Sequence, residues 1–313
     1  MNIVFFGSPN SAIPSLIKIL EAGHSIKLII TQPDKPSGRG KKLMPCPVTR
    51  MAQELNIPTH QPIKIRKDSL ALDNIKKIQP DLNVVVAYGQ IIPSEIIYLP
   101  KHNSLNVHFS LLPKYRGASP IQWALLNGEE KTGITIFELN EKMDEGDILI
   151  QDEVKISPYE NADELETRLA QKGAELLIKT IAHIDKIKPY KQDHSQASYA
   201  AKLSKENGQI DWAKNANYIE RQVKAFTPWP SAYTFFKNKR IKIHKGRKKE
   251  SQTKPYSSPG VILEINKEGI KACCGDGSIY LIEILQPENK KQMDAYAYSL
   301  GAKLKPGETF TWA

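Results

Sequence analysis

Three polar side chains near the middle of the chain are of the types that acyl transfer to an amine needs. Asn106 and His108 alternate along the apolar segment Leu105–Phe109, and Asp144 follows later, in the stretch MDEGDIL. Alternate side chains of a strand point to the same face, so we expect Asn106 and His108 to lie side by side. Asp144 directly precedes another apolar segment, from which its carboxylate could return to the same crevice and hydrogen-bond His108.

Each of these side chains suits one task in such a transfer. A neutral imidazole accepts a proton near pH 7, so His108 is the candidate for taking the proton of the attacking amine. The Asn106 amide can donate a hydrogen bond to the oxyanion of a tetrahedral intermediate. Asp144 would fix the tautomer of His108, favour its charged form and order a water that relays protons. The structural alternative is a satisfied strand histidine, a polar strand end and a turn aspartate beside Gly146.

The elements that must position these residues alternate between strands and helices. This alternation is typical of an α/β fold with a Rossmann-like, mostly parallel sheet, whose sites form at the carboxyl ends of the strands. Apolar runs predict strands at Asn2–Phe6, Ile26–Thr31, Leu82–Ala87, Leu105–Phe109, Gly133–Leu139 and Asp147–Gln151. Helical periodicity predicts helices at Ile13–Ala22, Val48–Leu55, Ser69–Ile78, Ile121–Leu126 and 163–184.

The character of the sequence changes after residue 187. Residues 188–206 are polar and lack periodicity, which predicts a linker between domains at 1–187 and 207–313. In the second domain a helix at Ala216–Ala225 precedes short β segments, which favours a small OB-like β-barrel. Glycine-containing turns join the last three of these segments, which are Arg240–His244, Val261–Asn266, Ile270–Cys274 and Ser278–Ile284.

Positive charge is concentrated in the second domain. Residues 1–189 hold 23 Lys and Arg against 22 Asp and Glu, whereas residues 190–313 hold 21 against 12, so that most of the net charge of +10 lies there. The stretch from Lys237 to Lys249 alone has eight basic residues and no acid. A one-sided basic domain indicates a polyanion partner such as a nucleic acid. The alternative is a solvated basic loop without a partner.

The sequence lacks the motifs that are typical of several classes of enzyme. The first turn reads GSPNSA rather than G-x-G-x-x-G, and no Walker A loop, HExxH or G-x-S-x-G segment occurs. The histidines and the three cysteines have no metal-ligand spacing, so we expect no metal. No apolar run is long enough for a membrane helix, and no targeting segment is evident. We therefore expect a cytoplasmic protein without a membrane partner, and a monomer.

The segment around the candidate site closely resembles a family signature. NVHFSLLPKYRGASPI (106–121) resembles the Asn-x-His, Ser-Leu-Leu-Pro and Arg-Gly pattern of folate-dependent formyltransferases. The resemblance continues through VVVAYGQIIP, KTGITI and MDEGDIL. The segments TQPDKPSGRGKKL, YAAKLSKENGQIDW and AFTPWPSAY are similar to the branch of the family that formylates methionyl-tRNA. Two departures are the GSPNS turn and Phe109, which is bulkier than expected and should point away from the site.

The resemblance implies an activity and a set of site residues. It implies transfer of the formyl group of 10-formyltetrahydrofolate, as co-substrate, to the α-amino group of initiator methionyl-tRNA. Asn106, His108 and Asp144 would be catalytic. The folate would be bordered by Val86, Ala87, Tyr88 and Gly89 and by Ser110, Leu111, Leu112 and Pro113. The tRNA would contact Arg39, Lys41 and Lys42 in the GRGKK loop, and the basic run supplies Arg240, Lys242, Lys245, Arg247 and Lys248.

Two other functions remain open at this stage. Formyl transfer to a small amine, such as a UDP-aminosugar or glycinamide ribonucleotide, would use the same three catalytic residues, but such an acceptor needs no basic docking domain. A non-catalytic RNA-binding protein would bind RNA regardless of changes at Asn106 or His108.

Overall fold

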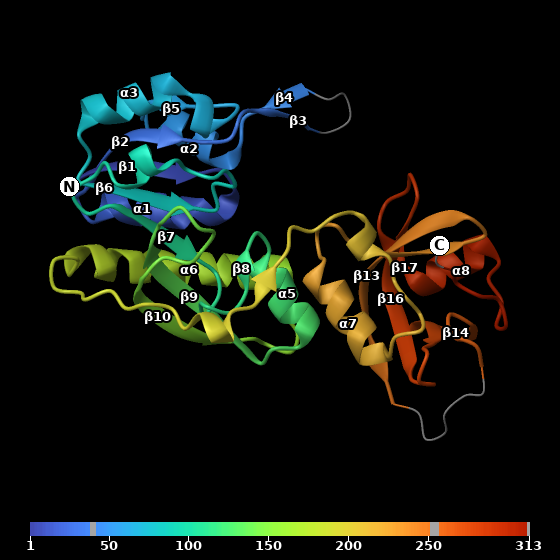
Figure 1. Ribbon diagram of the computed structural model, residues 1–313. Coiled ribbons are helices and arrows are strands. Elements are labelled where there is room, and N and C mark those ends of the chain that lie inside the picture. Colours follow the sequence, from blue (N-terminus) through green and yellow to red (C-terminus); the bar gives the residue numbers. More distant parts are fainter. Residues whose placement is uncertain (38–41, 251–256, 312–313) are drawn as a thin grey trace. The chain divides into compact units, whose positions relative to one another are not determined.

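The computed structural model describes residues 1–37, 42–250 and 257–311 (Figure 1). Contacts divide the chain into two units. The first comprises Met1–Pro120, Lys131–Ile156 and Glu166–Ala201, and the second comprises Ile121–Glu130, Ser157–Leu165 and Lys202–Ala313. No helix among the described residues is long and apolar enough to cross a membrane.

A seven-stranded sheet organises the first unit, in the order β10-β9-β7-β6-β1-β2-β5. The five strands from β7 to β5 are parallel, and β9 and β10 are antiparallel additions at one edge. All residues of β6 are buried, as expected for a strand covered on both faces. The predicted mostly parallel α/β sheet is thereby confirmed. The strands are β1 (Asn2–Gly7), β2 (Ser25–Ile30), β5 (Thr59–His60), β6 (Leu82–Val86), β7 (Ser104–His108), β9 (Lys131–Glu138) and β10 (Ile148–Lys155).

Local signals in the sequence explain where several helices begin. Asp68 accepts a hydrogen bond from the Ala71 backbone at the start of α3, and Pro47 opens α2. On α6, Gly173 faces Val107 and Phe109 of the β7 region, so Phe109 points into helix packing as predicted. The helices are α1 (Ile13–Glu21), α2 (Pro47–Glu54), α3 (Ser69–Ile78), α4 (Ser94–Ile97), α5 (Pro120–Asn127) and α6 (Ala162–Ala182), with short 3-10 turns at Asn10–Ala12 and Ile65–Lys67.

Much of the predicted linker belongs to the first unit. Tyr190 pairs with Ile148 of β10, and β11 (Tyr199–Ala200) pairs with β8 (Arg116–Gly117). Gln192 is 4% exposed, although it stands in a polar, aperiodic segment. Within the predicted linker 188–206, residues 190–200 thus pair with strands of the first unit. Pairings this short leave no periodic pattern in a sequence, because each one involves only one or two residues.

Antiparallel strands form the second unit, in the order β12-β13-β16-β15-β14, with β17 beside β16. Thr309 pairs with Val261 and Thr311 pairs with Phe235, so the C-terminal segment joins the two outer strands and closes the sheet. Trp212 stacks on Phe310 in the core. The predicted antiparallel second domain is confirmed. Its elements are α7 (Ala216–Ala225), β12 (Ala232–Phe236), β13 (Lys239–Lys249), β14 (Ile262–Asn266), β15 (Gly269–Cys273), β16 (Ile279–Pro287), β17 (Met293–Asp294) and α8 (Ala295–Ala302).

Candidate active site

Three neighbouring parallel strands end at the same level. Gly7 at the end of β1 is in register with Val86 at the end of β6, and Val86 is in register with Val107 of β7. His108 is the last residue of β7, and the segments after Val86 and His108 emerge beside each other. This is the carboxyl edge of the sheet, where open α/β sheets place their sites.

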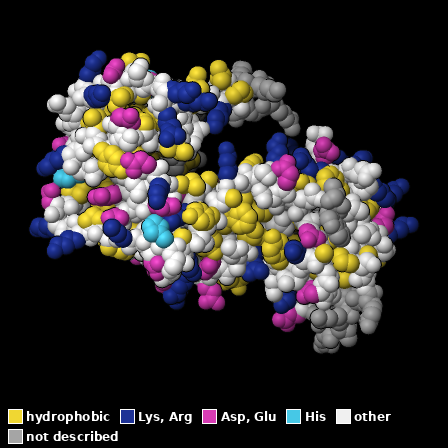
Figure 2. All heavy atoms as spheres, in the orientation of Figure 1, with side chains coloured by type: hydrophobic (Ala, Val, Ile, Leu, Met, Phe, Trp, Pro, Cys, Tyr) yellow, Lys and Arg dark blue, Asp and Glu magenta, His cyan; other side chains and the backbone are white. Residues whose placement is uncertain are grey.

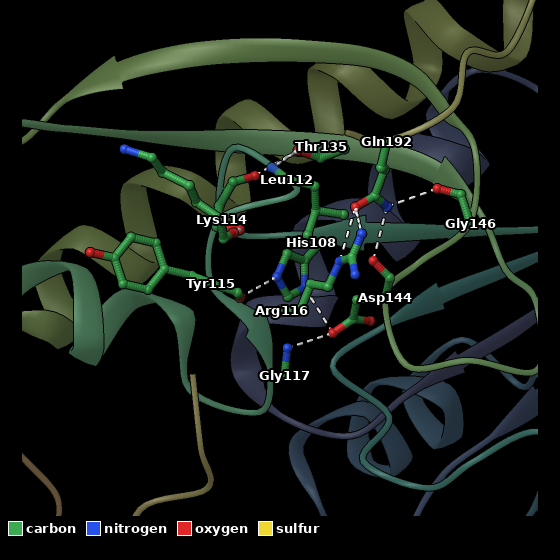
Figure 3. Close-up of polar contacts among 11 residues, drawn as sticks. His108, Leu112, Lys114, Tyr115, Arg116, Gly117, Thr135, Asp144, Gly146 and Gln192 are labelled. Atoms are coloured by element: carbon green, nitrogen blue, oxygen red, sulfur yellow. Dashed lines mark hydrogen bonds and ion pairs between the residues drawn. The ribbon is translucent and has the colours of Figure 1, made fainter. Parts of the chain in front are cut away.

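His108 and Asp144 are brought together, but not by the hydrogen bond expected from the sequence. His108 Nε2 lies 3.0 Å from the carbonyl oxygen of Tyr115, and Nδ1 lies 3.9 Å from Asp144 Oδ2 (Figure 3). The longer distance is that of an ion pair or of a contact through water. A carbonyl oxygen only accepts, so this arrangement places the proton of neutral His108 on Nε2 and leaves Nδ1 free towards the carboxylate.

The Asp144 carboxylate is held by backbone. Its Oδ2 accepts a hydrogen bond of 2.7 Å from the Gly117 backbone N–H. Asp144 itself has φ 55°, in the left-handed region that few residues other than glycine adopt. The position of the carboxylate therefore depends on the backbone conformation of residues 115–117 and of the loop that carries Asp144.

Asn106 lies on the same face of β7 as His108, as predicted from the alternation. Its register partners are Val85 on β6 and Phe137 on β9, and the ring of Phe137 packs edge-on against His108 at 6.3 Å. Within the described parts of the chain, the side-chain amide of Asn106 has no hydrogen-bond partner, and the residue is only partly buried. An amide that is positioned but unpaired can donate to a substrate oxygen.

The predicted folate segment after His108 is fixed by two side chains from the antiparallel strands. Thr135 Oγ1 donates to the Ser110 carbonyl at 2.6 Å and accepts from the Leu112 backbone N–H at 3.1 Å. Gln151 Nε2 donates to the Leu112 carbonyl at 2.8 Å. Ser110 Oγ closes the turn onto the Lys114 carbonyl. The segment from Ser110 through Leu111 and Leu112 to Pro113 is thus a shaped loop.

The other predicted folate-binding segment, from Val86 to Gly89, can offer mainly backbone atoms to a ligand. Val86 and Tyr88 are buried, and burial raises the pKa of the Tyr88 hydroxyl well above its usual value. Ala87 and Gly89 are exposed, and both have positive φ. Gln32 Nε2 donates to the Tyr88 carbonyl at 2.8 Å and fixes this turn. The two predicted folate-binding segments follow the adjacent strands β6 and β7, so both begin at the carboxyl edge of the sheet.

Sequence reasoning missed two buried residues behind the Asp144 loop. Arg116 is 1% exposed and Gln192 is 4% exposed, and they are hydrogen-bonded to each other. Arg116 was recognisable as part of the Tyr-Arg-Gly segment, but a lone arginine next to a glycine indicates no particular contact. Gln192 had no local signal.

The predicted tRNA-binding residues fall into two groups. Arg39 and Lys41 lie outside the described residues, and Lys42 begins β4 (Lys42–Met44), which pairs with β3 (Lys35–Ser37). The others lie on β13, where Arg240, Lys245, Arg247 and Lys248 are exposed and Lys242 is half-buried.

Acids partly neutralise the basic strand. Arg247 and Lys245 lie 3.3 Å and 3.9 Å from the carboxylate of Glu283 on β16. The Arg240 guanidinium lies over the Tyr233 ring, 5.6 Å from its centroid. Figure 2 shows lysine and arginine side chains interspersed with acidic ones on the surface of this unit. The cations of β13 are therefore of two kinds, those paired with Glu283 and those that are not.

No group of three or more metal-ligating side chains occurs among the described residues. The candidate chemistry uses an imidazole, an amide and a carboxylate. These groups suffice for proton transfer and oxyanion stabilisation.

Comparison with known proteins identifies the family. Residues 1–181 match the formyl transferase family, and residues 202–303 match the formyl transferase C-terminal domain. The methionyl-tRNA formyltransferase of Geobacter sulfurreducens is 43% identical over 98% of this chain and 96% of its own.

Solved structures share the fold. The sugar 3N-formyl transferase WlaRD has a TM-score of 0.65 at 23% identity, covering 93% of this chain and 99% of its own. A methionyl-tRNA formyltransferase from Clostridium thermocellum has a TM-score of 0.59 at 19% identity, covering 80% and 94%. Because both family domains are matched in order and a relative is similar over nearly its whole length, the chain belongs to the formyl transferase family.

Proposed function

We propose that this protein transfers the formyl group of 10-formyltetrahydrofolate to the α-amino group of initiator methionyl-tRNA, giving N-formylmethionyl-tRNA for translation initiation. The observation that carries the proposal is the 43% identity, over 98% of the chain, to a methionyl-tRNA formyltransferase. The structure of WlaRD was determined in the presence of 5-N-formyl-THF, which supports a folate as the formyl donor. We further propose that the protein acts in the cytoplasm as a monomer.

The chemistry is a direct transfer between two nitrogens. The amine nitrogen attacks the formyl carbon, and the new C–N bond gives a tetrahedral intermediate with a negative oxygen. Asn106 donates its amide hydrogen to that oxygen. The amine proton passes to Nδ1 of His108 through a water held between His108 and Asp144, and then to the folate nitrogen as its bond to the formyl carbon breaks. Asp144 faces the imidazolium across 3.9 Å and stabilises its charge.

The two loops beyond β6 and β7 would hold the folate. Ala87 and Gly89 offer exposed backbone, which can hydrogen-bond a flat pterin ring without competing side chains. The opposite wall is the loop from Ser110 to Pro113, including Leu111 and Leu112, which Thr135 and Gln151 keep in shape. Val86 and Tyr88 would support the first loop from the core.

A formyl-transfer assay with several acceptors tests the proposed function. Labelled 10-formyltetrahydrofolate is offered with initiator methionyl-tRNA, with a UDP-aminosugar and with glycinamide ribonucleotide. We expect label only on the tRNA. Transfer to a small nucleotide instead would preserve the catalytic assignment and refute the tRNA acceptor. RNA binding without any transfer would favour a non-catalytic RNA-binding protein.

The exposed cations of β13 would contact tRNA phosphates, together with Arg39, Lys41 and Lys42. Each phosphate contact releases counterions, so the logarithm of the affinity falls with the logarithm of the salt concentration. Arg240 and Lys242 have no ion-pair partner among the described residues, whereas Lys245 and Arg247 share Glu283. Unpaired cations are free to bind phosphate at no cost to an existing pair.

Charge-removal variants on β13 should therefore differ in their salt dependence. We expect the double variant Arg240→Gln/Lys242→Gln to reduce the salt slope of tRNA binding by about 0.7–0.9 for each cation. Lys245→Gln/Arg247→Gln should reduce the slope less, because Glu283 already neutralises part of that charge. Kd values for tRNA across a salt series measure both slopes. If neither double variant changes the slope, β13 does not contact the tRNA.

A further inference from the structure

A buried glutamine from the predicted linker reaches the loop that carries Asp144. Gln192 Nε2 donates to the carbonyl oxygens of Asp144 and Gly146, at 2.9 Å and 2.8 Å. Its Oε1 accepts from Nε and Nη2 of Arg116, at 3.1 Å and 2.7 Å. A glutamine amide has two hydrogens and two lone pairs, so its hydrogen-bonding capacity is fully used (Figure 3).

Arg116 fixes the amide in this orientation. A guanidinium only donates, so it selects the oxygen of Gln192 and turns the amide nitrogen towards the Asp144 loop. The buried cation is compensated by Glu145, 3.5 Å away, and it also donates to His194 Nδ1 at 3.1 Å. A buried charge with this many partners has a single favourable position.

The loop that Gln192 holds needs such support. Asp144 has φ 55°, and a non-glycine residue in this region persists where its surroundings enforce it. The two carbonyls bound by Gln192 belong to Asp144 itself and to Gly146. Gly146 lies so close to the Glu138 carbonyl that an added Cβ would be 1.6 Å from that oxygen. The loop is therefore fixed on both sides, by β9 and by Gln192.

The segment that contains Gln192 also fixes the backbone N–H that donates to the Asp144 carboxylate. Gly117, whose N–H binds Asp144 Oδ2, pairs with Ala200 in the short β8 and β11 ladder. Tyr115, whose carbonyl accepts from His108 Nε2, donates its own backbone N–H to Ser198 Oγ at 2.9 Å. Residues 192–200 therefore support both members of the proposed catalytic pair. Ser198 acts on His108 through Tyr115, and Ala200 acts on Asp144 through Gly117.

We propose that Gln192, oriented by Arg116, is a positioning residue that sets the place of Asp144 relative to His108. The segment predicted as a linker is thereby a part of the active site, and the rate of formyl transfer depends on it. This inference rests on the proposed catalytic roles of His108 and Asp144. Gln192 itself touches no reacting atom. Its removal leaves the carboxylate on a loop that relaxes from the left-handed conformation.

Two substitutions at Gln192 test this role. Gln192→Leu keeps a similar volume and removes all four hydrogen bonds. Gln192→Glu keeps an acceptor for Arg116 but replaces the amide nitrogen by an oxygen, which repels the carbonyls of Asp144 and Gly146. We expect both variants to lower kcat by about 10- to 100-fold, the effect of a catalytic group displaced by about 1 Å. KM for the folate and for the tRNA should stay within about threefold, because the Gln192 side chain is buried and all its hydrogen bonds are made within the protein.

The matched control is Gln196→Leu, in the same segment. Gln196 is exposed, and among the described residues its side chain binds only Asp193, so we expect wild-type kcat. If Gln192→Leu does not fold, Gln192→Glu decides the question, since the Arg116 charge remains paired in that variant.

His108→Ala, assayed alongside, separates this inference from the proposed site. A lowered kcat in both Gln192 variants, with His108→Ala inactive and KM unchanged, supports the positioning role. Wild-type kcat in a folded Gln192→Glu, with His108→Ala inactive, overturns that role while the site assignment stands. An active His108→Ala overturns the site assignment itself.

Discussion

We expect the replacement of His108 with alanine to lower kcat for formyl transfer by about 10²- to 10⁴-fold, the usual contribution of a positioned general acid–base group. The structure explains the expected size of this effect. His108 stands at the end of β7 with Nδ1 directed at Asp144 and Nε2 held by the Tyr115 carbonyl. Among the described residues, no other histidine contacts Asp144, and imidazole is the side chain that ordinarily exchanges protons near neutral pH. Single-turnover rates with saturating folate and methionyl-tRNA measure the effect.

The control is another histidine of the same unit. His183 is exposed, and in the part of the chain that the structure describes its Nδ1 contacts only the Lys179 carbonyl, so His183→Ala should transfer formyl groups at the wild-type rate. The affinity of His108→Ala for tRNA should be unchanged. A His108→Ala protein that loses tRNA binding but keeps its single-turnover rate would assign His108 to binding instead of chemistry.

The replacement of Asn106 with alanine should lower kcat by about 10²- to 10³-fold, the loss expected when an oxyanion donor is removed. Asn106 is partly buried on the His108 face of β7, and no described residue hydrogen-bonds its amide, so the donor is available to the intermediate. Asn106→Asp should lose at least as much, because an aspartate of the same size puts a negative charge beside the developing oxyanion.

The comparison of kcat with KM decides the role of Asn106. A donor that acts on the tetrahedral intermediate lowers kcat and kcat/KM together, whereas a donor that binds the ground state raises KM alone. An Asn106→Ala protein with wild-type kcat and a raised KM for the folate would make Asn106 a binding residue.

The parts of the fold that depend on local pattern could be predicted from the sequence. The run Leu82 to Ala87 predicted a strand buried on both faces, and β6 is such a strand. The alternation in Leu105–Phe109 separated Asn106 and His108 from Phe109, which packs towards α6. These predictions succeed because strand geometry fixes the face of each side chain from its neighbours alone.

The parts of the site that depend on long-range contacts could not be predicted. Gln192 binds a loop almost fifty residues earlier in the chain, and polarity alone made its segment look like a solvated linker. Asp144 was placed near His108 correctly, but its hydrogen-bond partner, the Gly117 N–H, is backbone and has no sequence signal. The basic run from Lys237 to Lys249 contains no acidic residue, but Glu283, on another strand, pairs with two of its cations.

The closure of the second unit has a consequence for synthesis of the protein. The outer strands β12 and β14 are joined by Thr311 and Thr309, which follow every strand of that sheet along the chain. A nascent chain on the ribosome therefore leaves the outer edge of β12 at Phe235 and the outer edge of β14 without these partners until residues 309–311 have emerged, and such edges invite pairing with other chains. The first unit ends at Ala201 in the chain. The proposed catalytic groups of Asn106, His108 and Asp144 therefore emerge from the ribosome before the strands of the second unit.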